Sequence, residues 1–179
     1  LAGLPDFQLL SASYTNISDL GPLASVTKLS SLAVDGAYVA DVTPLSGSTF
    51  LNYLSARDND IVDVSPLASL TGLYNLDLSG NAIVDIAPLA AIPVLDNLKV
   101  ANNEVVSLGS LSAFPVLRFL DVYQNQVSSL VGVNAPETLI TLDLQGNPLD
   151  CVTQASELER LGWGLSTYAH SCGAEQPRN

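Results

Sequence analysis

The sequence predicts an α/β repeat solenoid, in which stacked coils share one hydrophobic core and align a parallel β-sheet along a concave side. Two observations predict it. First, an apolar pattern repeats every 22 residues. Second, each repeat contains a short stretch with apolar residues at alternate positions, as in a strand. A fixed period of roughly 20 to 30 residues is typical of solenoids, because one coil cannot bury its apolar side until neighbours stack on it.

The first element is a fragment, and seven repeats with a 22-residue period follow it. Residues 1–6 fit the tail of a preceding repeat, in register with residues 67–72, so we expect a truncated coil and a longer natural polypeptide. The alternative is that this fragment serves as a minimal cap. The repeats then span residues 7–147 and begin at Phe7, Leu29, Leu51, Leu73, Leu95, Leu117 and Leu139.

Each repeat is expected to open with a short strand. Side chains at its first, fourth and sixth positions should point into the core, and those at the third, fifth and seventh should point outward, because neighbouring strand residues face opposite sides. Strands of successive coils should pair in parallel. The curved sheet that results forms the concave side.

An asparagine follows the strand in five repeats. An asparagine amide can bond carbonyl and N–H groups that a turning backbone leaves unpaired. Thr15 and Ala37 stand at this position in the first two repeats, so we expect those coils to be held less firmly. The asparagine ladder consists of Asn59, Asn81, Asn103, Asn125 and Asn147.

An aspartate and a proline three residues apart follow in the first four repeats. This spacing predicts a capped 3₁₀ segment on the convex side, which is otherwise irregular. In the fifth and sixth repeats Ser107 and Ser129 replace the aspartate, and Ser110 and Gly132 replace the proline, so the convex side should change there. The four pairs are Asp19 and Pro22, Asp41 and Pro44, Asp63 and Pro66, and Asp85 and Pro88.

Calcium binding is an alternative interpretation of the acidic cluster of Asp58, Asp60 and Asp63. A calcium loop also needs a glycine and a distal glutamate at set positions, and both are missing here. We therefore expect no metal.

Residues 148–179 are expected to form a C-terminal cap. Residues 153–161 have helical spacing at Ala155, Leu158 and Leu161, which predicts a cap helix. The chain has two cysteines, Cys151 and Cys172, and we expect them to form a disulfide that contributes about 3 kcal/mol. Such a bridge would imply an oxidising compartment, whereas two buried thiols would fit a reducing cytosol.

The repeat pattern resembles that of leucine-rich repeat proteins. The consensus L-x-x-L-x-L-x-x-N-x-I-x-D-I-x-P-L is fullest in residues 51–67 and 73–89, and the D-x-x-P-L turn with a 22-residue period is similar to the bacterial internalin type. The resemblance covers residues 7 to about 149. It implies a horseshoe or arc that binds a protein or peptide on its concave face, in a secreted, periplasmic or surface-displayed receptor or adhesin. The N-P-x-x-C segment is similar to extracellular repeat caps, although those often carry four cysteines.

The candidate binding residues point outward from the predicted strands. Three aromatic residues project from a face that no predicted element covers, which is typical of contact anchors; shielding by a missing segment is the alternative. Lys99 lies between two aspartates, and Arg57 lies near Asp35. Two roles remain open for these basic side chains: they neutralise the neighbouring carboxylates, or they contact a ligand. The candidate ligand-binding set is Tyr53, Arg57, Asp77, Lys99, Phe119, Asp121 and Tyr123.

Charge argues against several classes of partner. Six Lys and Arg residues against eighteen Asp and Glu residues give a net charge of -12, which repels nucleic acid and anionic lipid. The acidity could attract a basic partner or simply maintain solubility. No apolar run reaches the roughly 18 residues of a membrane span, so direct membrane insertion is not expected.

No motif points to catalysis or a cofactor. His170 is the only histidine, and we interpret it as a surface residue of the cap. Phosphate-binding glycine motifs and zinc spacings are absent from the sequence. Asn16-Ile17-Ser18 matches a glycosylation acceptor, but three residues are too short a pattern to weigh heavily. We therefore expect no enzyme.

Two other functions remain open. The chain could be a structural spacer or targeting arm of a larger protein whose activity lies elsewhere. An intracellular phosphatase-regulating repeat protein of similar period is a third interpretation, which the cap cysteines and the D-x-x-P-L turns disfavour.

Overall fold

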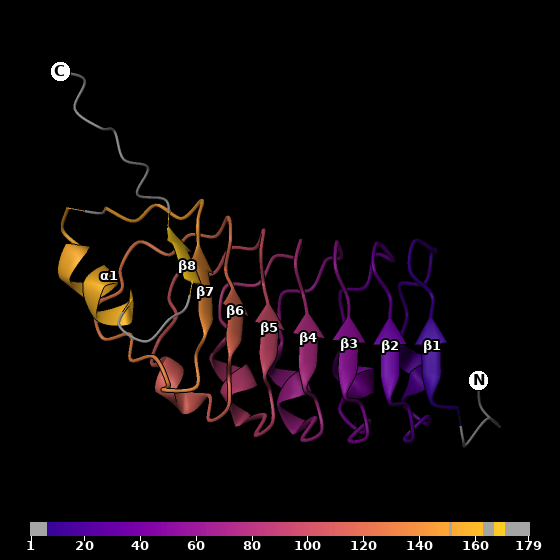
Figure 1. Ribbon diagram of the computed structural model, residues 1–179. Coiled ribbons are helices and arrows are strands. Elements are labelled where there is room, and N and C mark those ends of the chain that lie inside the picture. Colours follow the sequence, from indigo (N-terminus) through magenta and orange to yellow (C-terminus); the bar gives the residue numbers. More distant parts are fainter. Residues whose placement is uncertain (1–6, 151, 163–166, 171–179) are drawn as a thin grey trace.

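The computed structural model describes residues 7–150, 152–162 and 167–170, and it shows a row of stacked coils (Figure 1). The strands pair in parallel in chain order, each with the next. The parallel solenoid predicted from the repeat is therefore confirmed. The strands are β1 (Leu9–Ser11), β2 (Ser31–Ala33), β3 (Tyr53–Ser55), β4 (Asn75–Asp77), β5 (Asn97–Lys99), β6 (Phe119–Asp121), β7 (Thr141–Leu144) and β8 (Thr167–His170).

The core runs along the whole row because each coil contributes apolar side chains from the same repeat positions. The central leucine of the strand is at most 2% exposed in coils two to seven, whereas Leu10 of coil one is only half-buried. The first position of each of these coils is likewise a fully buried leucine, such as Leu51 or Leu73. Stacking on both sides is what closes the core.

Short 3₁₀ segments form the side of the coils opposite the sheet, as predicted. In coils one to four each contains the repeat's proline in its first turn. The segments are η1 (Gly21–Leu23), η2 (Thr43–Leu45), η3 (Ser65–Ser69), η4 (Ala87–Ala91) and η5 (Leu111–Ala113).

The repeat aspartate binds the start of these segments, but it is not the N-cap residue that we expected. The N-cap is the following residue, such as Ile86, and the Asp85 carboxylate accepts a hydrogen bond from the backbone N–H of Ala87, the first helical residue, at 2.8 Å. Asp19, Asp41 and Asp63 make the equivalent bond. The proline that follows has no N–H, so the first helical residue provides the donor.

The convex side changes in coils five and six, where the proline is replaced. Ser107 and Ser129 keep the bond of the aspartate, since their hydroxyls accept from the N–H groups of Gly109 and Val131 at 3.1 and 3.2 Å. The 3₁₀ segment, however, begins at Leu111, two residues later than the period predicts. Both the aspartate and the proline are replaced in coil five, but Ser107 keeps the aspartate's bond, so we attribute the shift to loss of the proline.

The helix α1 spans Ala155–Gly162 and follows β7. Its Arg160 donates a hydrogen bond to the Val133 carbonyl of coil six, and Gln154, just before the helix, accepts from the Leu130 N–H at 2.8 Å. The predicted fragment 1–6 and both cysteines, Cys151 and Cys172, lie outside the described residues. None of the helices in the described part of the chain is long and apolar enough to span a membrane.

Candidate functional site: the concave strand face

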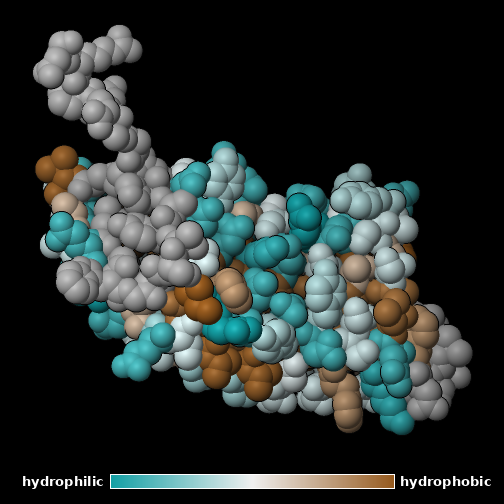
Figure 2. Space-filling view, in the orientation of Figure 1, coloured by the Kyte–Doolittle hydropathy of each residue, from teal (hydrophilic) through white to brown (hydrophobic). Residues whose placement is uncertain are grey.

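The candidate site is the outward face of the sheet, which we call the concave face. In Figure 1, among the described residues, no helix lies in front of β1 to β5. Figure 2 shows hydrophilic and hydrophobic residues intermixed over the same side. Along β1 to β5 this side of the sheet is therefore the accessible one.

Strand pairing aligns the candidate residues into columns. Asp77 pairs with Lys99, Lys99 with Asp121, and Asp121 with Asp143. Residues paired across neighbouring strands lie about 4.8 Å apart. One lysine and three aspartates thus form a continuous charged column along β4 to β7.

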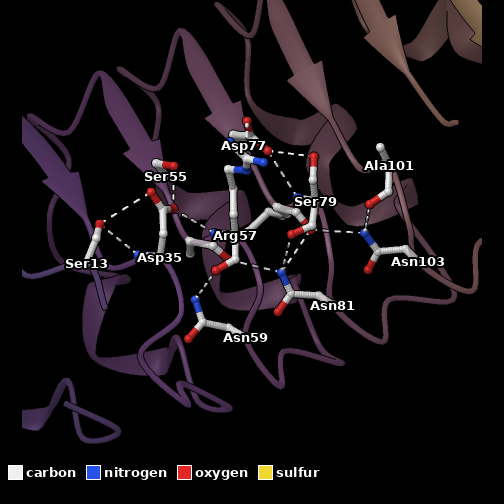
Figure 3. Close-up of polar contacts among 12 residues, drawn as sticks. Ser13, Asp35, Ser55, Arg57, Asn59, Asp77, Ser79, Asn81, Ala101 and Asn103 are labelled. Carbon is white, nitrogen blue, oxygen red and sulfur yellow. Dashed lines mark hydrogen bonds and ion pairs between the residues drawn. The ribbon is translucent and has the colours of Figure 1, made fainter. Parts of the chain in front are cut away.

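The asparagine ladder follows the strands in the chain and ties each of coils three to seven to the coil before it; Figure 3 shows Asn59, Asn81 and Asn103. Asn103 shows the pattern. Its Oδ1 accepts from the Ile83 N–H at 3.0 Å, and its Nδ2 donates to the carbonyls of Leu78, 25 residues earlier, and of Val100. Asn59, Asn81, Asn125 and Asn147 also accept from the N–H 20 residues earlier and donate to the carbonyl 25 residues earlier.

Each ladder asparagine bonds the coil before its own, so a missing asparagine weakens the junction with the preceding coil. Asn59 ties coil three to coil two, since it accepts from Ala37 and Val39 and donates to Val34. Coil two is therefore held on its C-terminal side, contrary to our expectation that both early coils are loosely held. The junction between coils one and two is the one that Ala37 leaves without an amide, while Thr15 bonds only its own coil, at the Ala12 carbonyl.

Asp35 is bonded differently from the alternative in which the Arg57 side chain neutralises it. The hydroxyls of Ser13 and Ser55 donate to its carboxylate at 3.3 and 2.6 Å, and the Arg57 backbone N–H donates at 2.9 Å (Figure 3). The Arg57 side chain reaches the next strand instead, where its Nε lies 4.0 Å from Asp77 Oδ2. Serine donors already satisfy Asp35, which leaves the guanidinium exposed.

The three candidate aromatic residues differ in exposure. Tyr53 is 41% exposed, and Phe119 and Tyr123 are half-buried. Phe119 and Tyr123 lie four residues apart on one strand and its extension, so both rings are on the same face. Tyr53 also borders a hollow of about 70 Å³ between β3 and β5, whose lining includes Asp77 and Lys99.

A charged network at the start of the strands was missed from the sequence. Arg118 donates to both carboxylate oxygens of the buried Asp96 and to the hydroxyl of Tyr74 at 2.8 Å, and its guanidinium lies 5.4 Å from the centre of the Phe119 ring. Asp96 raises the pKa of Arg118. The available signal was the shared second position of Tyr74, Asp96 and Arg118 in successive repeats.

The charges on this face do not form a metal-binding cluster in the part of the chain that the structure describes. There, no group of three or more His, Cys, Asp or Glu side chains is placed to hold a metal ion. Asp58, part of the calcium alternative, instead lies against Gly80, where a Cβ would come within 2.3 Å of its Oδ1. Lys99 is exposed and joins no salt bridge with a described residue.

Comparison with known proteins identifies the fold. The family described as Leucine Rich repeats (2 copies) matches residues 49–91. The structure is similar to that of an internalin, InlF, from Listeria monocytogenes, with 29% identity, a TM-score of 0.86, and coverage of 96% of this chain and 51% of that one. The chain thus spans about half the length of this solved relative. No curated protein sequence matches it.

Two further structures show how widely the fold is shared. Internalin C2 from Listeria monocytogenes is 28% identical, with a TM-score of 0.78 over 93% of this chain and 72% of that one. The ectodomain of the plant receptor kinase GASSHO1/SCHENGEN3 from Arabidopsis thaliana was solved in complex with CASPARIAN STRIP INTEGRITY FACTOR 2. It is 21% identical, with a TM-score of 0.68 over 82% of this chain and 19% of that one. The chain has leucine-rich repeats, and its structural neighbours include internalins.

Proposed function

We propose that this chain is a non-catalytic interaction module that binds a protein or peptide across the concave face of coils three to seven. The observation that carries the proposal is the arrangement of Tyr53, Phe119 and Tyr123 with exposed charges on a sheet face in unbroken register. Aromatic side chains on a rigid surface lose little conformational entropy on binding and are common anchors of interfaces.

The comparisons support the class of function. Internalin-like leucine-rich repeat folds are protein-interaction modules, and one structural neighbour was solved with its partner bound. Fold alone does not determine the partner, because solenoids change ligands by changing surface residues over the same core.

We further propose a secreted or surface location and a cap, residues 148–179, closed by a disulfide between Cys151 and Cys172. The internalin likeness and the ectodomain among the neighbours support export. The test is a thiol assay on unfolded, unreduced protein. Absence of free thiols is expected, and two free thiols would remove the argument for an oxidising compartment.

The binding proposal is tested by capture from host-cell and bacterial surface extracts. The test variant replaces Tyr53, Phe119 and Tyr123 by alanine. The matched control replaces Tyr14, Tyr38 and Phe50, two tyrosines and a phenylalanine that are exposed outside this candidate set. We expect wild type and the control to retain a partner that the test variant loses, with all three proteins folded by circular dichroism.

Other outcomes favour other functions. Retention by the test variant would place binding on the convex side or the cap. If no protein retains a partner, the chain is better explained as a spacer or targeting arm of a longer protein. The internalin InlF, of which this chain covers 51%, shows that related repeats occur within larger chains.

A further inference from the structure

Four side chains at the C-terminal end of the concave face lie together. Phe119 and Asp121 belong to β6, Tyr123 follows two residues later on the same face, and Asp143 of β7 pairs in register with Asp121. We call these four residues the β6–β7 patch. Asp121 therefore has an aromatic residue on either side along its strand and a second carboxylate beside it.

In each carboxylate of the patch, one oxygen accepts a hydrogen bond from a described residue and the other does not. Asp121 Oδ1 accepts from the Tyr123 N–H and Asp143 Oδ1 from the Gln145 N–H, both at 3.0 Å. Within the described residues, neither Oδ2 has a hydrogen-bond partner and neither residue joins a salt bridge. Among the described residues, two oxygen acceptors on neighbouring strands thus have no hydrogen-bond donor.

The surroundings disfavour the negative charge that the patch carries. Burial raises the pKa of Asp121 above its ordinary value, and the charges of Asp143 and Asp77 raise it further, against the Tyr123 N–H and Lys99, which lower it. A cation placed over the two carboxylates would relieve this repulsion. Lys99 lies on the β5 side of Asp121, so Asp143 has no basic neighbour on β6.

The aromatic rings favour an organic cation as the occupant. The guanidinium of Arg118, which bonds Asp96 and Tyr74, already lies 5.4 Å from the centre of the Phe119 ring, so this ring contacts a cation within the protein itself. Aromatic faces attract guanidinium and ammonium groups, and ring edges pack against the apolar stem of a basic side chain. A metal ion would need further ligands, and no group of three is present among the described residues.

We propose that the β6–β7 patch docks a basic segment of the partner protein and receives one of its arginine or lysine side chains between Phe119 and Tyr123, over Asp121 and Asp143. This inference rests on the proposed concave-face function and adds the chemistry of the partner. The net charge of -12 draws such a segment toward the molecule, and the patch fixes where it binds.

The test uses fluorescein-labelled hexa-arginine as the probe and measures its anisotropy at physiological salt. The test variant is Asp121→Asn with Asp143→Asn. The matched control is Asp60→Asn with Glu104→Gln, which removes the same charge from two exposed residues that make no side-chain hydrogen bond with a described residue. We expect the probe to bind about tenfold more weakly to the test variant and less than about twofold more weakly to the control. A lost charge-assisted hydrogen bond should reduce the affinity more than the same change in net charge elsewhere on the surface.

A third variant tests the rings. Phe119→Leu with Tyr123→Leu keeps apolar volume but removes both aromatic faces, and we expect several-fold weaker binding of the same probe. Equal losses in the test and control charge variants, or no binding by wild type, would overturn the proposal. Unchanged thermal unfolding of the variants shows that each is folded.

The result is distinguishable from failure of the proposed function itself. If the Tyr53, Phe119 and Tyr123 alanine variant loses its captured partner while the Asp121 and Asp143 variant keeps both partner and probe, the concave face binds but the cation proposal is wrong. If the alanine variant keeps the partner, the concave-face function is wrong.

Discussion

Coils one and two differ from coils three to seven in both their internal ties and their outer surface. Among coils two to seven every junction has an asparagine that bonds the preceding coil, whereas Ala37 leaves the first junction without one. Coil one also borders a hollow of about 470 Å³ lined by Leu10, Ala12 and Ile17. The outward columns of the first two coils carry serine and alanine at several positions, and the aromatic residues begin at Tyr53.

The difference teaches that the candidate contact residues occur where the coils are tied together. A surface held by buried hydrogen bonds loses little freedom when a partner binds, which favours affinity. The junction between the two early coils lacks an asparagine bond, and the outward columns of these coils lack aromatic residues. We therefore interpret coils three to seven as the binding part and the first junction as the weaker part of the solenoid.

The largest effect on the free energy of unfolding is expected from removing an asparagine that bonds two central coils together. Asn103→Ala removes an acceptor for the Ile83 N–H and a donor to the Leu78 and Val100 carbonyls, all in the buried interior. Several backbone groups then lose their partners, so we expect the free energy of unfolding to fall by about 3 to 5 kcal/mol. Urea unfolding measures it.

The control for this variant is Thr15→Ala, which removes one bond within coil one. Its Oγ1 bonds the Ala12 carbonyl at 2.6 Å, so a loss of about 1 kcal/mol or less is expected. Equal losses in the two variants would show that the ladder is not what distinguishes the central coils.

A smaller effect is expected from adding the missing tie. In the ladder's spacing, Ala37→Asn would place an amide near the Ala12 carbonyl and the Ile17 N–H, residues that line the hollow beside coil one. We expect a gain of about 1 kcal/mol in unfolding free energy and slower amide exchange in coil one. Ala37→Leu fills similar volume without polar atoms, and an equal gain there would assign the effect to packing instead.

The smallest effect is expected in the pH dependence of stability, which should differ in sign between Asp121 on the concave face and Asp63 on the convex side. The pKa of Asp121 is raised in the folded protein, so its ionised form reduces stability at neutral pH, and stability returns as the pH falls through that raised pKa toward 3.8. Asp121→Asn should therefore stabilise at neutral pH, by less than about 1 kcal/mol because the group is half-exposed, and the gain should shrink toward pH 3.8.

Asp63 on the convex side provides the opposite sign. The Ser65 N–H and hydroxyl lower its pKa below 3.8, so its contribution is present above pH 3.8 and is lost as the pH falls through the lowered value. Asp63→Asn should destabilise at neutral pH. Chemical unfolding from pH 3 to 7 measures both variants, and parallel profiles would contradict the assignment.

The repeat period made much of this structure predictable. A strict 22-residue interval places equivalent residues of successive coils side by side, so the core leucines, the strand register and the outward columns all follow from counting. The positive φ angles after the strand cannot be predicted from the repeat period in the same way. Asp58 and Gly80 occupy the same repeat position and both have positive φ, 52° and 73°, although only glycine adopts it without strain.

Contacts between side chains of different coils were less predictable. Arg57 reaches forward to Asp77 rather than back to Asp35, and Arg118 holds Asp96 and Tyr74 together. Such pairings depend on rotamers and on competing donors such as Ser13 and Ser55, which the repeat pattern does not encode. The period fixes which residues are neighbours, but not which of them bond.

The most direct test of the concave-face account is site-specific cross-linking to the captured partner. A photoreactive phenylalanine analogue is placed singly at Tyr53, Phe119, Tyr38 or Phe50, and cross-linked partner is detected by mass spectrometry. The account predicts cross-links from positions 53 and 119 and none from 38 and 50. Cross-links confined to 38 and 50 would contradict it.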